Sequence, residues 1–510
     1  MVALRAARHI KCDEGKPICK KCSAGQLKCT YVDSPRKGKG KSNSELQTPS
    51  EASSPPLPSP GHALNLMELS GDDATCFDFF RNVMIPKLSG FFEAEFFQHT
   101  VLQLSFSEPA IWHALLAITS FALPKEYFEP DRKGKQTFPV FSRRFALDHY
   151  NKAVERLHGT MSQGELPVEV ILTACLSFSI LEIAFKNIQG AITHLQAGLR
   201  VLYSWKANHG EQNVTIDTYL TPIFEDFMIR AITYGWTNLS TEKHTYQPEL
   251  ERQAYFSNVR EARISLLQIQ RFGLEAARTF EMHKVDQSLG ALTAGSSEEQ
   301  RSQFVDSLQQ WSQNFEKLLS TLRISQLDAK EVYAINTLRF QQKLAAIYIP
   351  YKFDNDETKF DSHVQDFEDA LETAEFLCSS TNGTASEGES CQDLMFVGMH
   401  CPQVFVIITK CRNPVLRRRG LVLLKALPRG EDIRARTVVP EVAERVIAIE
   451  EEGLEGLRDA KGLVVPSDWA RVHDINVISE LAGDPKRCVV QFRLKGRDGV
   501  WYHREDEFVL

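Results

Sequence analysis

The chain lacks the features that mark a membrane-spanning or secreted protein. Its most apolar run, residues 170–185, includes Glu182 and is shorter than the roughly 20 residues that a bilayer-spanning helix needs. The N-terminus is basic without an apolar core, so we expect no signal peptide. The seven cysteines from Cys76 to Cys488 follow no framework spacing, which predicts reduced thiols in an intracellular protein. The sequence therefore predicts no membrane partner.

The chain also lacks the short motifs of common catalytic sites. It contains no phosphate-binding loop, no nucleophile elbow and no His-Glu metal-binding helix. It has no fixed-period repeat of the kind that forms a solenoid. These absences favour a chain that acts by binding, and we expect that it is not an enzyme.

Three local clusters have both a structural and a functional interpretation. The glutamates at 450–452 are compatible with an acidic catalytic cluster and the arginines at 417–419 with a phosphate contact, but both runs are typical of solvated helix faces. His400, Cys401 and Cys411 are compatible with a second metal site, yet their context is apolar and buried free cysteine is common. We therefore expect two exposed charged faces and one core segment.

The most informative stretch is a basic, cysteine-rich segment close to the N-terminus. Residues 8–31 hold four of the 11 cysteines, Cys12, Cys19, Cys22 and Cys29, in the spacing C-x6-C-x2-C-x6-C. A Cys-x2-Cys turn lets two thiolates bind one zinc ion, and further thiolates complete a tetrahedral shell. Because so short a segment cannot bury a core of its own, a metal has to hold it together. The spacing predicts that these four cysteines bind Zn2+.

Charge is distributed unevenly along the chain. Residues 1–41 carry 11 lysines and arginines against three acidic residues, a net charge of +8. Since the whole chain carries −7, the remainder carries −15. A basic head on an acidic body indicates that only the head meets a polyanion such as double-stranded DNA.

The cysteine-rich segment resembles the fungal-type binuclear zinc cluster, the DNA-binding module of many fungal transcription factors. Cys12 matches the third of the family's six cysteines, the other three match the fourth to sixth, and Pro17 stands in the loop between them. The first cysteine pair is absent, and its positions hold Val2 and Arg5. Four thiolates complete at most one all-sulfur site, whereas the family's six share two ions. Met1 directly precedes the expected first cysteine, so we expect the native coding sequence to begin further upstream.

The resemblance also implies which residues contact DNA. In the family, the segment between the second and third cysteines enters the major groove, and Arg8, His9 and Lys11 occupy it here. These three are implied to contact base edges and phosphates, and Arg5 a phosphate. Four lysines are implied to attract the phosphate backbone whatever its sequence: Lys16, Lys20, Lys21 and Lys28.

A disordered linker, residues 34–71, is expected to follow a zinc module confined to residues 1–33. The linker is rich in Ser, Pro, Gly and Lys with few large apolar residues, so it cannot repay the entropy of ordering. Its basic run at 36–41 is compatible with a solvated tail, an electrostatic aid to DNA binding or a nuclear import signal. No heptad repeat follows the cysteines, so a homodimer would have to form through the helical body.

Residues 72–460 have the apolar spacing of a large helical domain. Large apolar residues recur three and four apart, as in Phe304, Leu308 and Trp311. The segment after Pro167 is apolar nearly all round, which predicts a helix buried in the middle of the domain.

Cap and turn residues predict where some of these helices begin. Ser107 predicts an N-cap, with Pro109 in the first turn of the helix that follows. Residues 187–190 predict a short turn before an antiparallel helix. The order of such core and turn patterns over residues 75–455 resembles the fungal-specific transcription factor domain, which implies a helical regulatory domain without active-site residues.

The last part of the chain, residues 461–510, has a different pattern. Segments 474–481, 488–494 and 500–508 predict short strands, and in the second of them apolar and polar residues alternate. The predicted fold is therefore mainly α, with a small zinc-cysteine module, a disordered linker, a large all-helical domain and a short antiparallel sheet near the C-terminus.

Together these observations predict a nuclear, zinc-dependent, sequence-specific DNA-binding regulator of RNA polymerase II transcription, whose partners are promoter DNA and the transcription machinery. The first alternative is a co-regulator that has lost DNA binding and acts through its helical domain. The second is an all-helical enzyme with an accessory zinc knuckle. Zinc content and DNA affinity separate the DNA-binding regulator from the co-regulator, and a cleft with paired carboxylates would favour the enzyme.

Overall fold

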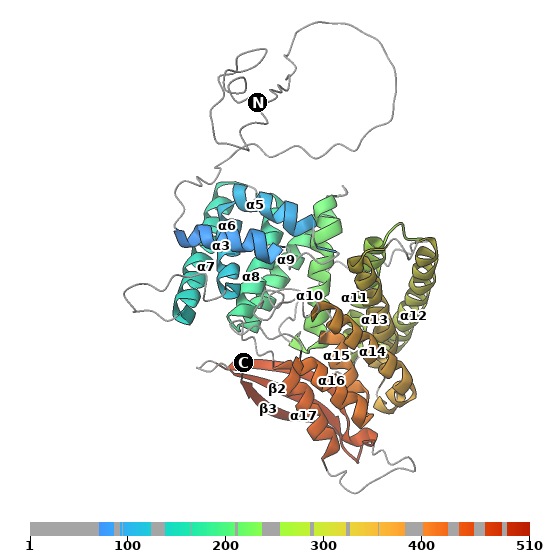
Figure 1. Ribbon diagram of the computed structural model, residues 1–510. Coiled ribbons are helices and arrows are strands. Elements are labelled where there is room, and N and C mark those ends of the chain that lie inside the picture. The colour runs from blue at the N-terminus through green and yellow to red at the C-terminus, as the bar shows by residue number, and fades with distance from the viewer. Residues whose placement is uncertain are drawn as a thin grey trace, which may run out of the picture. The chain divides into compact units, whose positions relative to one another are not determined.

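The computed structural model of the chain (Figure 1) describes residues 71–85, 92–93, 95–123, 138–164, 166–209, 213–236, 255–285, 290–322, 327–354, 356–382, 401–426, 438–452, 465–481 and 487–509. The chain divides into two compact units, Met1–Ser59 and Pro60–Leu510, and all of the described residues belong to the second. The predicted zinc module and, apart from Gly71, the predicted linker lie outside the described residues.

The first group of helices, blue to green in Figure 1, shares one apolar core. Helix α6 packs against α7, and α8 packs against α9. Trp112 and Phe224 are fully buried in this core. The elements are α3 (Gly71–Phe79), η2 (Phe80–Met84), η3 (Phe96–Val101), α5 (Leu102–Ser107), α6 (Pro109–Ala122), α7 (Phe138–Gln163), α8 (Val168–Ala184), α9 (Ile188–Asn208), η5 (Ile216–Leu220) and α10 (Thr221–Thr233).

Helix α8 contributes most to this core because its sequence is apolar on every side. Ten of its 17 residues are buried, and it contacts both α6 and α9. It begins after Pro167, as predicted, and ends in a tight turn where Lys186 has a φ of 58°. The side chain of Asn187 then caps α9 by accepting a hydrogen bond from the amide of Gly190. Helix α9 therefore starts inside the segment predicted as a turn.

A second apolar core lies between α11 (Val259–Val285), α12 (Gly290–Thr321) and α13 (Ala329–Tyr348). The predicted stripe on α12 is buried here, including Phe304 and Trp311. The indole N–H of Trp311 donates to the carbonyl of Ala262 on α11 at 2.8 Å. A capping box of Asp328 and Glu331 begins α13 and satisfies amides that the first turn leaves unpaired.

The third core joins the last helices to the sheet, orange to red in Figure 1. Helix α15 contacts α16 and α17, and α17 also contacts the first strand. The elements are η8 (Pro350–Phe353), η9 (Glu357–His363), α14 (Val364–Asn382), α15 (Cys401–Lys410), α16 (Pro414–Ala426), α17 (Val439–Glu451), η12 (Asp468–Ala470), β1 (Val472–Leu481), β2 (Arg487–Lys495) and β3 (Trp501–Val509).

The three strands form an antiparallel sheet in the order β1-β2-β3. The alternation in β2 gives the predicted two-faced strand, and its buried side chains are those of Cys488, Val490, Phe492 and Leu494. Irregularities in the β1–β2 register occur within residues 472–474 and 477–479.

One backbone contact attaches the end of α10 to the outer edge of β1. The amide of Val477 donates to the carbonyl of Gly235 at 2.9 Å. Gly235 has a φ of 74°, and a Cβ on it would lie 1.9 Å from the carbonyl oxygen of Ile475. Only glycine fits this close approach, so the free edge of β1 is partly occupied by the helical body.

The predicted fold class, mainly α with a short antiparallel sheet near the C-terminus, is confirmed. The N-cap of α6 is Glu108 rather than Ser107, which ends α5 instead, while Pro109 is in the first turn as predicted. No helix among the described residues is long and apolar enough to span a bilayer. The predicted domain limits at residues 33, 71 and 460 remain predictions.

Candidate functional site

Every residue predicted to bind zinc or DNA lies outside the described part of the chain. The predicted zinc ligands are Cys12, Cys19, Cys22 and Cys29, and the predicted DNA contacts are Arg5, Arg8, His9, Lys11, Lys16, Lys20, Lys21 and Lys28. Their arrangement in space therefore stays a prediction. Among the residues that the structure does describe, no group of three His, Cys, Asp or Glu side chains is placed to hold a metal ion.

The described residues include a buried charge cluster made of Glu357, Lys410, Arg412, Arg417 and Glu450. At its centre the carboxylate of Glu450, fully buried on α17, accepts hydrogen bonds from Arg412 and Arg417 at 2.8 Å each. Burial alone would raise the pKa of Glu450, but the two guanidinium charges outweigh it and lower the pKa to about 2. Glu450 is therefore ionised throughout the physiological pH range.

Two sequence-based expectations are wrong at this cluster. Glu450 and Arg417 were expected on solvated helix faces, but both are fully buried and paired with each other. Their neighbours do face solvent: the side chain of Arg418 is 52% exposed and that of Glu452 is 67% exposed. The reason is the helical period, which turns one member of each three-residue charged run toward the core. By contrast, Cys411 lies in the core as expected.

The other half of the charge cluster joins η9 to α15. Glu357 pairs with Lys410 at 2.8 Å and with Arg412 at 3.0 Å. Burial opposes ionisation of Glu357, but the charges of Lys410 and Arg412 lower its pKa below the ordinary value. Arg412 therefore bridges the two carboxylates Glu357 and Glu450, and the five charges form one continuous network.

A neighbouring ion pair extends this network to the loop before β1. The guanidinium of Arg471 binds the carboxylate of Asp361 through two hydrogen bonds of 2.9 and 2.7 Å. Arg471 also donates to the carbonyls of Glu357 and Pro466, both at 2.8 Å. Each charge in the network has an oppositely charged partner inside the fold, so the network connects the sheet to the helices. Sequence reasoning missed it because the ion-pair partners are 33 to 110 residues apart in the sequence.

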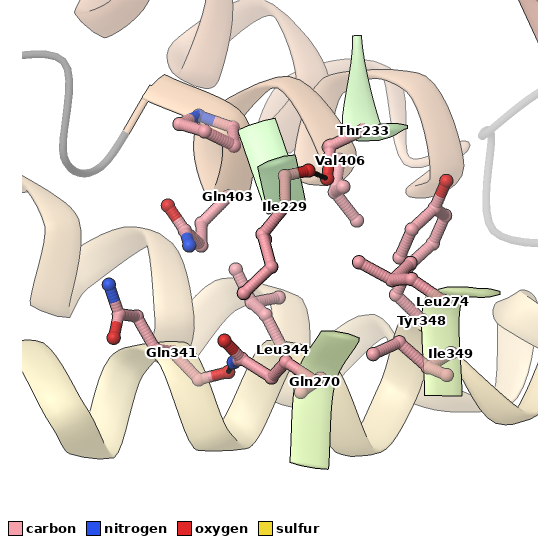
Figure 2. Close-up of a pocket in the computed structure, with 12 residues that line it drawn as sticks. Ile229, Thr233, Gln270, Leu274, Gln341, Leu344, Tyr348, Ile349, Gln403 and Val406 are labelled. Atoms are coloured by element: carbon pink, nitrogen blue, oxygen red, sulfur yellow. Dashed lines mark hydrogen bonds between the residues drawn. The ribbon is translucent and has the colours of Figure 1, made fainter. Parts of the chain in front are cut away.

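A separate pocket lies between α10, α11, α13 and α15 and opens to solvent, with about 370 Å3 of space when the open solvent at its mouth is included. Figure 2 shows the side-chain amides of Gln341 and Gln403 at one end and the apolar side chains of Leu274 and Ile349 at the other. The side-chain oxygen of Gln403 is buried and has no hydrogen-bond partner among the described residues. Because none of the lining residues is charged, the pocket suits water or a small uncharged molecule.

Comparison with known protein families gives two matches. The model described as fungal specific transcription factor domain matches residues 75–399, and the model described as fungal Zn(2)-Cys(6) binuclear cluster domain matches residues 7–38. No curated protein and no solved structure matches the chain. The first match covers more than half of the chain, and the second covers all four predicted zinc ligands.

The donor set of the matched cysteine segment fits zinc, the cofactor of this module, but only in part. A Zn(2)-Cys(6) module binds two zinc ions with six cysteines. Residues 7–38 contain four cysteines and no other sulfur ligand. Four thiolates complete one tetrahedral site, and the second ion of the family's cluster has no full ligand set in this segment.

Proposed function

The chain belongs to the family of proteins with a fungal specific transcription factor domain, and from this premise we propose that it is a zinc-dependent, sequence-specific DNA-binding regulator of RNA polymerase II transcription that acts in the nucleus. Its two matched domains are those of DNA-binding transcription regulators. The observation that supports the proposal most is the zinc-cluster match at residues 7–38 inside a segment of net charge +8. An enzymatic role has less support, because both matched domains are those of transcription factors.

The proposal divides the chain into a zinc module at 1–33, a linker at 34–71, a helical regulatory domain at 72–460 and a sheet at 461–510. Bound zinc would hold the otherwise coreless module in shape through its cysteine thiolates. Within the module, Arg8, His9 and Lys11 would contact base edges and phosphates, with Arg5 on a phosphate. The lysines would supply attraction to the backbone that does not depend on sequence: Lys16, Lys20, Lys21 and Lys28.

The test combines zinc content with DNA binding by the full chain. Native mass spectrometry should find one zinc per chain, and fluorescence anisotropy should find a duplex selected from a random pool that binds more tightly than scrambled duplexes. Arg8→Ala should reduce this preference, whereas Lys28→Ala should weaken binding to all duplexes and make its logarithmic salt slope shallower by about 0.9. A chain that binds no zinc, or that binds every duplex equally, would contradict the proposal.

A second candidate function is favoured by the incomplete cysteine set. A co-regulator without DNA binding would act through its helical domain by protein contacts, and its module would need no complete cluster. Introducing cysteines at positions 2 and 5 separates the two candidates. If Val2→Cys/Arg5→Cys binds two zinc ions and gains duplex affinity, the remaining parts of the module are intact and the DNA-binding regulator is favoured. If the variant binds zinc without any duplex affinity, the co-regulator is favoured.

A further inference from the structure

The outer edge of β3 is the one sheet edge that the described residues leave open. Strand β3 pairs with β2 over its whole length, and no described residue pairs with its other side. The edge of β1, in contrast, donates to Gly235 and to the buried carboxylate of Glu450. An open edge presents a row of unpaired amides and carbonyls and is a template for another strand.

Apolar side chains are exposed at both ends of β3. Trp501 and Tyr502 at its start are 37% and 47% exposed, and Val509 at its end is 50% exposed. Between them lies a charged segment that is basic at His503 and Arg504 and acidic at residues 505–507. The strand is therefore apolar at its ends, positive before its centre and negative after it.

This order makes β3 complementary to itself when it runs antiparallel to a second copy. With Glu505 opposite Glu505, Arg504 of one copy lies opposite Asp506 of the other, and His503 lies opposite Glu507. At the ends, Trp501 meets Val509 and Tyr502 meets Phe508, both on each side of the two-fold axis. Opposite charges and aromatic or apolar side chains placed directly across a strand pair stabilise the pairing.

We propose that two copies of this chain join through their β3 edges, with Glu505 at the two-fold axis, and form one six-stranded antiparallel sheet. The proposal places homodimerisation at the sheet rather than in the helical body. It concerns residues outside both family matches, and it is independent of DNA binding.

Charge also selects this register over its neighbours. A centre at Arg504 would place two arginines opposite each other and Trp501 opposite Glu507. A centre at Asp506 would place two aspartates opposite each other and Glu505 opposite Glu507. The registers centred on Glu505 and on Arg504 each have one like-charge pair, but of these three registers only the one centred on Glu505 places Arg504 opposite an acidic residue and Trp501 opposite an apolar one.

The first experiment measures the molar mass of the full chain by light scattering after size exclusion over a range of concentrations. The parent chain should shift from the mass of one chain to that of two. His503→Glu should raise the dissociation constant by on the order of tenfold, because it places two acidic residues opposite each other twice per dimer. Adding Glu507→Lys to His503→Glu should restore the parent value, and Glu505→Gln should tighten the dimer because it removes the like-charge pair at the axis.

These variants keep the fold of the single chain. His503 lies opposite Arg493 on β2, so a glutamate there gains a partner within the chain. Among the described residues, the ion-pair partner of Glu507 is exposed Arg487, a surface contact that contributes little. Val422→Glu, which adds the same charge at an exposed position on α16, is the matched control and should leave the dissociation constant unchanged.

A second experiment tests the register directly. Glu505→Cys should form a disulfide-linked dimer under mild oxidation, because residues directly opposite each other bring their Cβ atoms within about 5.5 Å. His503→Cys and Glu507→Cys should each cross-link no more than the parent chain when oxidised alone, and should cross-link when mixed. A chain that stays monomeric at every concentration, or an equal yield for Glu505→Cys and His503→Cys, overturns the proposal.

Discussion

At the residue scale, we expect the carboxylate of Glu450 to contribute strongly to the free energy of unfolding. It is fully buried and neutralises two arginines that are themselves fully buried, Arg412 and Arg417. Glu450→Gln removes its charge with almost no change in shape and leaves two guanidinium groups without a full counter-charge. We expect a loss of about 3–5 kcal/mol in the free energy of unfolding, because breaking a buried ion pair strands a desolvated charge.

The control for this prediction is Glu452→Gln, two residues along the same segment. Glu452 pairs with Arg504 at the surface, where both side chains are partly exposed. Its loss should cost less than about 1 kcal/mol. Chemical unfolding followed by circular dichroism measures both variants, and equal midpoints would show that the buried cluster does not stabilise the fold.

A buried and a half-buried histidine, His473 and His113, predict how the free energy of unfolding changes with pH. Burial lowers the pKa of His473 to about 4, although the charge of Glu357 opposes the shift. Burial and the neighbouring His149 lower the pKa of His113 to about 4 as well. Between pH 6.5 and pH 4 the unfolded chain therefore binds protons that the folded chain does not, so the free energy of unfolding falls as the pH falls.

This effect is measured as the change in the midpoint temperature of thermal unfolding over a series of pH values from 7 to 4. Each histidine contributes at most about 3 kcal/mol over this window. His473→Gln should flatten the dependence, and the same change at exposed His158 should leave it as it is. A His473→Gln variant with the parent's slope would contradict the assignment.

The residue scale is also where sequence reasoning fails most. Glu450 and Arg417 stand in runs of like charge whose local pattern is that of a solvated helix face. Their burial depends on partners brought together by the tertiary fold, and neither run contains a signal for it. The predicted core positions of α12 are correct because apolar periodicity depends only on the helix itself.

At the scale of elements, the contact between α9 and α10 depends on a missing side chain. A Cβ on Gly198 would lie 2.4 Å from Cε1 of Phe224, which is fully buried. Gly198→Ala should therefore destabilise the fold by about 1–3 kcal/mol, because the packed core has to move to accept a methyl group.

Gly159 on α7 provides the matched control. A Cβ there has nothing within 4 Å, so Gly159→Ala should stabilise the fold by about 0.5–1 kcal/mol through the lower entropy of the unfolded chain. Denaturant unfolding of the two variants should give shifts of opposite sign. Two shifts of the same sign would show that α9 and α10 do not approach as described.

Element types followed from the sequence more reliably than element ends. Strand β2 and helix α8 are where alternation and all-round hydrophobicity predicted them, and β1 and β3 overlap the other two predicted strand segments. The starts of α6 and α9 differ by one or a few residues from the prediction. At α9 the side chain of Asn187 accepts a capping hydrogen bond, whereas Glu108 makes no side-chain cap at α6, and composition reveals neither choice.

At the scale of the whole molecule, the division into two units predicts separate unfolding. All six tryptophans lie in the second unit, so tryptophan fluorescence reports on that unit alone. Cys19→Ala should abolish zinc binding and leave the fluorescence-detected thermal transition unchanged. Zinc content is measured by native mass spectrometry on the same samples.

The converse variant completes this test. Cys411→Ala, at a fully buried position in the second unit, should lower the transition temperature and leave zinc content unchanged. A lowered transition in Cys19→Ala would mean that the two units stabilise each other. The predicted zinc ligands could be named from cysteine spacing and the predicted DNA contacts from the family resemblance, whereas their geometry depends on a metal that composition cannot position.

The hydrogen bond from the amide of Val472 to Glu450, 2.9 Å long, has a consequence for exchange with deuterated water. That amide can exchange only when β1 separates from α17 and the charge cluster opens, so it should be among the last in the sheet to be labelled. The amides of β3 that point away from β2 should be labelled quickly in dilute solution and slowly at concentrations where two copies pair. Amide-resolved mass spectrometry would thus measure deuterium uptake at the β1 edge, which is bonded to the helical body, and at the open β3 edge in one time course.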